Sequence, residues 1–556
     1  MNTFIFTVVF ILVAVAVLYP ILIMIVQSFQ SSLPGQPVEW SLVGWRKALT
    51  EPGMLDSVAN TFKVSFVRQG LAFLFAVPIA YVLARTNLPG KHWLEFLFWI
   101  ALLIPGLVVT IAWILLLDPD YGLVNEWVQR LPFINGPIFD IYSYWGIILV
   151  FTASTGVAFK VVLLTPAFMN MDAALEDASR VSGASNIGTF ARIFVPVMGP
   201  SILVLILMAF IHSLQTFEIE LILGSPSRFF VFGTKIFDLI RDDPPQYPAA
   251  TAIGTMIMIS VLPLIVLYRW YSGRRRFTTV GGQYRSNVVE LRRWKWPIFA
   301  GILSLGLLAT VAPLILLVVG SFMNIFGFFN IRDTWTLSNW TDVLTRDAFI
   351  TSLRNTLIVS GGAALVASIG FSIIAYITVR TRFFAREPLN LMTWIPLALP
   401  GIILGLGVLA MVLGNPFLRP IYGTHYILIG IAAVSGMTLS VQMLQAVMRQ
   451  ISFELEEASV ITGASWLQTY RWVVLPIITP SMIAVGLLVF ILTSRNVSSI
   501  ALLGTRNTRP LSLLQMDYLL DGKLAEGAVI GTVMVVITVG IAIAARAFGF
   551  RVGLRS

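Results

Sequence analysis

A polar stretch that lies between two long apolar segments occurs twice in this chain. The first copy runs from Asp177 to Ala184, and the second runs from Glu457 to Ala464, a shift of 280 residues without a gap. The same shift carries the prolines that follow, Pro196 and Pro200, onto Pro476 and Pro480. A whole segment repeated in register indicates duplication of one structural unit. The chain must therefore fold as two related halves.

Each copy predicts a short helix, a tight turn and a second short helix. A carboxylate heads the first helix, and Gly183 or Gly463 ends it, because glycine adopts a positive φ without a Cβ penalty. In the second copy Ser465 and Gln468 have the Ser-x-x-Gln spacing of a capping box. The restart of the helix is therefore encoded locally.

The apolar segments around these copies predict a multi-pass membrane protein. Of 556 residues, 57% are hydrophobic and 12% are charged, which is about half the charged fraction of a soluble domain. The uncharged run from Phe4 to Val26 is too long for a signal-peptide core and lacks a basic start, so we interpret it as a retained helix. We expect an all-α membrane protein with about twelve transmembrane helices, near 4–27, 62–84, 96–117, 144–170, 198–223, 249–269, 296–322, 356–379, 390–413, 426–447, 477–493 and 528–545.

Further matches indicate two parallel six-helix repeats. At a shift of 295, Trp45 matches Trp340, Asn60 matches Asn355, Arg85 matches Arg380 and Pro105 matches Pro400. The shift then falls from 295 to 280, so the first half carries 15 extra residues near 118–144. An even number of helices per repeat gives both halves the same orientation. We predict a first repeat at 1–269, a basic cytoplasmic linker at 270–295 and a second repeat at 296–556.

Lysine and arginine set the expected topology. Their density is higher in the loops that are cytoplasmic if the N-terminus is cytoplasmic, as the positive-inside rule requires. The linker contributes strongly through the run Arg274-Arg275-Arg276. The net charge of +10 is then a topology signal rather than a sign of nucleic-acid binding. The linker could alternatively bind anionic lipid or a regulator. Both polar repeats lie on the cytoplasmic side in this topology.

The sequence contains no recognisable catalytic set. It has no cysteine and three histidines, so disulfides and Cys-ligated metal sites are excluded and we expect no metal site. No Gly-x-x-x-x-Gly-Lys-Ser/Thr sequence occurs, so the chain cannot cradle ATP with a P-loop. We expect a conduit that binds no cofactor of its own and is powered from outside.

The two polar repeats resemble the EAA loop of permeases in binding-protein-dependent ABC importers, whose permeases have the type I importer fold. In that family an acidic residue, small residues and a glycine form the cytoplasmic coupling helix that docks into an ATPase subunit. Ser459 replaces the second alanine in the second copy, and Asp177 replaces the usual glutamate in the first. The resemblance implies ATPase docking by Glu176, Asp177, Ala178, Gly183, Ala184, Glu457, Ala458, Gly463 and Ala464.

We expect the second loop to matter more for docking than the first. Asp177 has Glu176 beside it as a possible substitute, whereas Glu457 alone occupies the family's acidic position in the second copy. The alternative is that these are ordinary connecting loops without a docking function, because a polar loop between membrane helices commonly contains an acid and a glycine. Two copies in register, each followed by prolines, argue against that alternative.

Polar residues also mark the ends of the fifth and eleventh predicted helices. Such residues at membrane depth are costly and are functional candidates by default. In permeases of this type these helices flank the translocation path, so the resemblance implies an outer mouth lined by Gln215, Glu218, Glu220, Arg495 and Asn496. The alternative is that they are interfacial helix-end residues or a structural ion pair between the halves.

Nearly the whole chain resembles fused twelve-helix permeases, which are typical of the ferric-iron importer group and its relatives for thiamine, phosphonates and polyamines. The run from Phe217 to Gly224 looks like that group's fifth-helix ending. The resemblance implies a bacterial inner-membrane permease that receives its substrate, iron(III) as first choice, from a periplasmic binding protein. Two partner ATPase subunits, which bind ATP and Mg, would drive transport. A secondary transporter is one alternative, but it leaves the paired acidic loops unexplained. A membrane enzyme or assembly scaffold is another, but no catalytic set or large partner surface is visible in the sequence.

Overall fold

The protein is helical, as the sequence predicts. The computed structural model describes residues 2–134, 136–169, 181–183, 186–274 and 288–547. Within these ranges nine helices are long and apolar enough to cross a membrane, or up to twelve if each sharply bent pair is one span. The long helices, some interrupted by a short π-helical segment or by a turn, are α1 (Asn2–Gln27), α3 (Met54–Arg85), α7 and α8 (Tyr144–Phe151, Val157–Met169), α14 (Tyr247–Arg274), α15 and α16 (Lys295–Ala309, Val311–Ser321), α18 and α19 (Asp347–Leu365, Phe371–Arg380), α23 (His425–Met448), α26 (Leu475–Ser494) and α28 (Leu524–Ala547).

Two spans predicted as single helices are sharply bent. Helix α4 (Lys91–Ala101) meets α5 (Gly106–Leu117) at 102°, and the segment Arg386–Ala398 meets α22 (Gly401–Gly414) at 113°. Each second half begins after a proline, Pro105 or Pro400, in extended backbone conformation. Proline lacks the N–H that would continue the preceding helix, and it disfavours helical backbone in the residue before it. The bends therefore fall at equivalent places in the two halves.

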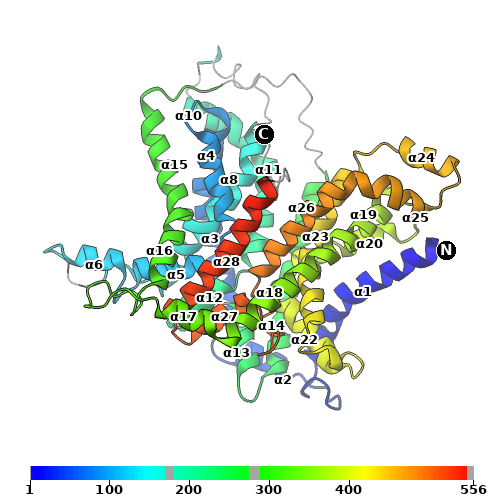
Figure 1. Ribbon diagram of the computed structural model, residues 1–556, viewed down its shortest axis with the longest axis horizontal. Helices are drawn as coiled ribbons and strands as arrows, with labels where there is room; N and C mark the ends of the chain where they lie inside the picture. The colour runs from blue at the N-terminus through cyan, green and yellow to red at the C-terminus, as the bar shows by residue number, and fades with distance from the viewer. Residues whose placement is uncertain (1, 135, 170–180, 184–185, 275–287, 548–556) are drawn as a thin grey trace. The chain divides into compact units, whose positions relative to one another are not determined.

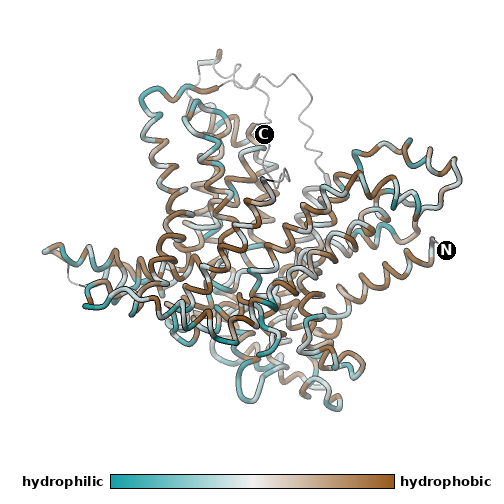
Figure 2. The backbone as a smooth tube through the Cα atoms, viewed as in Figure 1, coloured by the Kyte–Doolittle hydropathy of each residue, from teal (hydrophilic) through white to brown (hydrophobic). Residues whose placement is uncertain are grey.

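Hydrophobic residues run along the lengths of helices such as α1 and α15 (Figure 2). Helix α1 contains no charged residue and leaves Phe4 and Leu12 more than half exposed. In a membrane, lipid chains cover such side chains, so their exposure agrees with the predicted multi-pass class. The structure thus confirms the all-α membrane fold class.

The first compact unit, unit 1, comprises Met1–Leu55, Phe232–Met258 and Trp340–Ser556. Its helices α18, α19, α23 and α26 pack against one another, and α1 packs along α22 (Figure 1). A Cβ atom at Gly407 in α22 would lie 2.7 Å from the carbonyl oxygen of Pro20 in α1. Only glycine permits this approach, so a small-residue patch brings these two helices together.

The second compact unit, unit 2, comprises Asp56–Val231 and Ile259–Asn339. In its core Phe98 of α4 packs with Ala76 of α3 and Ile302 of α15. Each unit therefore joins most of one sequence half with the first membrane helix of the other half: α1 belongs to unit 1, and α15 and α16 belong to unit 2. The predicted repeat boundaries describe the duplication in sequence, and these packing units follow different boundaries.

Candidate functional site

The second polar repeat forms a helix, a turn and a restarted helix in unit 1. Helix α24 (Glu454–Ile461) ends before Gly463, and α25 (Trp466–Thr469) follows (Figure 1). Gly463 has φ +86°, in the left-handed region that favours glycine. The Ser465 side chain accepts a hydrogen bond from the Gln468 backbone N–H at 3.4 Å, and Gln468 Oε1 accepts one from the Ser465 N–H at 2.7 Å. The predicted glycine turn and capping box are both present.

A buried arginine connects α24 to the membrane helices. Arg380, the last residue of α19, has a fully buried side chain whose Nε lies 3.2 Å from Glu456 Oε1, close but not aligned as a hydrogen bond. Its Nη2 donates to the carbonyl oxygens of Met448 and Ile451, where α23 ends. Its guanidinium also lies 4.1 Å from the ring centroid of Phe453. One side chain thereby connects α19, the end of α23 and the start of α24.

Aromatic and hydroxyl groups complete the attachment. The Tyr376 hydroxyl donates to Glu456 Oε2 at 3.2 Å, and its ring lies 5.2 Å from that of Tyr470. The Ser459 hydroxyl hydrogen-bonds the Thr469 hydroxyl at 3.0 Å, which holds α24 against α25. Serine at this position, a departure from the family pattern, therefore has a structural role.

The two adjacent carboxylates of the second loop point to different environments. Glu456 is turned inward and only 13% of its side chain is exposed, whereas Glu457 and Ala458 are exposed. Glu457 is thus free to meet a partner surface, and Glu456 is not. Glu456 is therefore no substitute for Glu457, and the expected asymmetry between the loops stays a prediction, because Glu176 and Asp177 lie outside the described residues.

The first loop lies largely outside the described residues. Glu176, Asp177, Ala178 and Ala184 are among those that the structure does not describe, so their predicted role stays a prediction. Gly183 is exposed and has φ +77°, as the repeat predicts.

The end of α3 in the first half repeats part of the arrangement at the end of α19 in the second half. Arg85 ends α3 as Arg380 ends α19, is 1% exposed and lies 5.5 Å from the Phe194 ring centroid. Tyr81 lies 4.7 Å from the ring of Phe190, as Tyr376 lies near Tyr470. These described side chains at the ends of α3 and α19 are therefore related by the duplication.

One predicted mouth residue, Glu220, lies inside the helix packing of unit 2. It is 1% exposed, and its carboxylate accepts hydrogen bonds from Arg68 of α3 and from the Thr216 hydroxyl. Arg68 also donates to the Ser213 hydroxyl and lies 4.4 Å from the ring centroid of Phe151. Glu220 does not face an open path here; it belongs to a structural ion pair, and that pair lies within the first half rather than between the halves.

The other predicted mouth residues are half-buried. The Glu218 carboxylate lies against Gly106 at the start of α5, since a Cβ there would meet Glu218 Oε2 at 2.5 Å. In the second half the Ser498 hydroxyl occupies the equivalent place against Gly401. Asn496 accepts a hydrogen bond from the Ser499 N–H at 3.2 Å and so shapes the turn after α26. Gln215 and Arg495 are half-buried in units 2 and 1, respectively.

Sequence reasoning missed Arg68 and the role of Arg380. A signal existed for both: Arg68 falls inside a predicted membrane span, where a charge requires a partner, and Arg380 is one of the residues matched between the repeats. Neither signal identifies the carboxylate with which the arginine pairs.

Comparisons with known proteins find similar sequences over part or most of this chain. Residues 76–277 match the family described as binding-protein-dependent transport system inner membrane component. A ferric transport system permease protein FbpB of Actinobacillus pleuropneumoniae is 28% identical over 384 residues, which cover 68% of this chain and 55% of that protein. The match thus spans about half the length of that relative. An Fe(3+)-transport system permease protein FbpB 2 of Haemophilus influenzae is 22% identical over 86% of this chain and 87% of its own.

Solved structures also resemble part of the chain. A bacterial alginate ABC transporter, crystallised with an alginate pentasaccharide-bound periplasmic protein, contains a chain that is 21% identical. The match covers 48% of this chain and 91% of that one, with a TM-score of 0.39.

Proposed function

We propose that this chain, which belongs to the family of binding-protein-dependent transport system inner membrane components, is the permease subunit of an ATP-driven importer. The observation that carries the proposal is the second acidic loop, repeated in sequence 280 residues apart. There the helix α24 presents Glu457 outward while Arg380 holds Glu456 inward. An anchored helix that exposes carboxylates, Glu457 among them, suits docking to a basic groove on a partner.

The proposed partners are two ATP-binding-cassette ATPase subunits and a periplasmic substrate-binding protein. ATP and Mg would bind to the ATPases, since the chain has no P-loop sequence. Closure of the ATPases on ATP would draw the two acidic loops together and open the path to the outer side, and hydrolysis would reset it. Alternating access of this kind requires a transport element whose two states differ in their contacts with the partner.

Iron(III) is the proposed substrate. Its support is the names of the relatives, which are ferric transport permeases. Importers for phosphonate, polyamine or thiamine are the alternatives within the same class. A secondary transporter would need no ATPase and would move substrate on an ion gradient alone.

The test is reconstitution of the chain in liposomes with candidate ATPase and binding-protein partners. ATP-dependent uptake of radiolabelled iron(III), abolished by an ATPase variant that cannot hydrolyse ATP, supports the proposal. ATP-dependent uptake of another substrate keeps the importer and corrects the cargo. Uptake that persists without the ATPase and follows an imposed ion gradient rejects the importer mechanism.

A further inference from the structure

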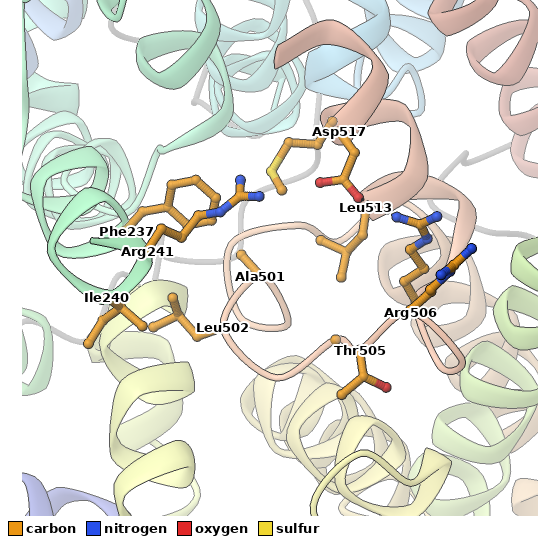
Figure 3. Close-up of a pocket in the computed structure, with 12 residues that line it drawn as sticks. Phe237, Ile240, Arg241, Ala501, Leu502, Thr505, Arg506, Leu513 and Asp517 are labelled. Atoms are coloured by element: carbon orange, nitrogen blue, oxygen red, sulfur yellow. Dashed lines mark hydrogen bonds and ion pairs between the residues drawn. The ribbon is translucent and has the colours of Figure 1, made fainter. Parts of the chain in front are cut away.

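A cavity of about 550 Å³ lies in unit 1 between α13 (Phe232–Arg241), the loop after α26 and α27 (Leu511–Leu520). Its charged lining residues are Arg241, Arg506, Arg509 and Asp517, and its apolar walls include Phe237 and Leu513. Figure 3 shows Arg241 and Arg506 on opposite sides of the cavity, carried by α13 and by the loop. The cavity is thus lined by side chains from separate elements.

Positive charge is in excess in this cavity. Arg509 Nη1 lies 2.8 Å from Asp517 Oδ2, and this ion pair neutralises one guanidinium. Arg241 and Arg506 are exposed, and within the described part of the chain the structure records no ion pair for either. Three guanidinium groups against one carboxylate leave two positive charges. A concave surface of one sign concentrates ions of the opposite sign.

The loop that carries two of these arginines is held in place. The Asn355 side-chain amide donates to the carbonyl oxygens of Asn507 at 2.9 Å and Arg509 at 3.2 Å. The Thr505 and Thr508 hydroxyls hydrogen-bond each other at 2.8 Å across the turn. The guanidinium groups therefore project from an ordered loop, which reduces the cost of arranging them around a ligand.

We propose that this cavity binds the oxyanion group of a small ligand, a carboxylate, sulfate or phosphate. Guanidinium groups present paired N–H donors that match two oxygens of such a group, and the bonds are charge-assisted. In the sequence, the residues that line the cavity follow the fifth and the eleventh predicted spans, whereas the two acidic loops follow the fourth and the tenth. By this count the cavity and the acidic loops lie at opposite ends of the spans, so the anion would bind on the side away from the proposed ATPase dock.

This inference does not rest on the proposed function, but it bears on the cargo. A bare trivalent cation is repelled by a cavity with two excess positive charges. Iron(III) held by anionic ligands is not repelled, and neither is a substrate that is itself an oxyanion. The charge of the cavity thus favours cargo that presents an anionic group.

Titration of Asp517 should make the anion affinity of the cavity depend on pH. Burial raises the pKa of Asp517, and Asp521 raises it further, while Arg509 and Arg241 act in the opposite direction. The charged groups that line the cavity with Asp517 are Arg241, Arg506 and Arg509. Protonation of Asp517 removes the negative charge that opposes an anion. Affinity for a ligand whose own charge is constant therefore increases as pH falls through the pKa of Asp517.

The test is equilibrium binding of radiolabelled sulfate to the full chain in nanodiscs of zwitterionic lipid. Sulfate is chosen because its charge does not change as Asp517 titrates. We expect saturable binding that Arg241→Gln and Arg506→Gln each weaken by at least roughly threefold. Asp517→Asn should strengthen it by a similar factor and remove its pH dependence. Arg332→Gln, at an exposed arginine that does not line the cavity, is the matched control and should have no effect.

Sulfate affinity should fall in the arginine variants and rise in the aspartate variant. This distinguishes a specific site from misfolding, because misfolding weakens binding in every variant. No saturable sulfate binding to the wild-type chain overturns the proposal. If sulfate does not bind and Arg506→Gln instead weakens association with the binding protein, the cavity docks carboxylates of that protein, and the small-ligand assignment is rejected. Equal weakening by Arg332→Gln identifies surface charge as the cause and also rejects the site.

Discussion

The guanidinium Nε of Arg380 and the carboxylate Oε1 of Glu456 lie 3.2 Å apart where α19 ends and α24 begins. Neither side chain is free to turn to solvent, since 0% and 13% of them are exposed. Because Arg380 also binds the carbonyl oxygens at the end of α23, a displacement of α24 must be transmitted to two membrane helices. If an ATPase docks on α24 as proposed, this pair connects it to the membrane segments.

Replacing Arg380 with glutamine should uncouple docking from transport. The change leaves Glu456 without its cation, and loss of an interaction with a charged group costs about 1.5–3 kcal/mol, so α24 becomes loosely attached. We expect the ATPase to co-purify through the unchanged Glu457, while substrate-stimulated ATP hydrolysis falls severalfold. Arg386→Gln, at an exposed arginine near the same helix end, is the control. Full coupling in Arg380→Gln would show that the pair transmits nothing.

Glu457 and Glu456 should give different phenotypes. If a partner desolvates Glu457, its change to alanine costs about 2–5 kcal/mol of association, with no loss of thermal stability because the side chain is exposed in the free chain. Glu456→Ala should instead lower thermal stability. The measurements are an ATPase pull-down and a melting curve for each variant, with exposed Glu454→Ala as the control on the same helix.

Asp177→Ala should weaken ATPase binding less than Glu457→Ala does. Glu176 stands beside Asp177 as a possible substitute, whereas Arg380 holds Glu456 inward, where it cannot replace Glu457. An unchanged pull-down for both would remove these loops as the dock.

Gly463 should tolerate asparagine better than valine. A Cβ at this position meets no atom within 4 Å, so the restriction is the backbone, with φ +86°, and not space. Asparagine enters the left-handed region more readily than other residues, whereas a β-branched residue there is a strong outlier. We expect Gly463→Val to cost roughly 1–2 kcal/mol more than Gly463→Asn, seen as weaker ATPase co-purification. Equal behaviour of the two variants would argue against the turn as the cause.

Local features of this fold could be predicted because local chemistry specifies them. The apolar runs gave the positions of the spans, and the spacing of Ser465 and Gln468 gave the capping box. The positive φ of Gly463 follows from its place at a helix end. Each of these depends on residues that are close to one another in the sequence.

Long-range pairs could not be predicted from one sequence. Arg68 and Glu220 are 152 positions apart, and pairing them requires the rotation and register of two helices. The inward turn of Glu456 and the outward turn of Glu457 depend likewise on where Arg380 ends α19. The bend at Pro105 was not predicted either, because a proline permits a break but the packing around it sets the angle.

The two ends of the spans should differ in access to an impermeant thiol reagent. The chain has no cysteine, so single substitutions report cleanly. Thr462 lies in the second acidic loop, and Asn507 lies in the loop beside the cavity; both are exposed. In intact cells Asn507→Cys should label and Thr462→Cys should not, and both should label in inverted vesicles. Labelling of Thr462→Cys in intact cells would reverse the predicted topology.

Glu220 is expected to act through stability. Glu220→Gln leaves Arg68 charged and buried, and breaking a buried ion pair by changing one partner costs about 3–5 kcal/mol. The variant should lose thermal stability in lipid, and transport should fall in proportion to the folded fraction. The double variant Glu220→Leu with Arg68→Met, which removes both charges, should recover stability, since replacing a buried pair by apolar groups is often neutral. A Glu220→Gln chain with unchanged stability and reduced uptake would return Glu220 to the substrate path.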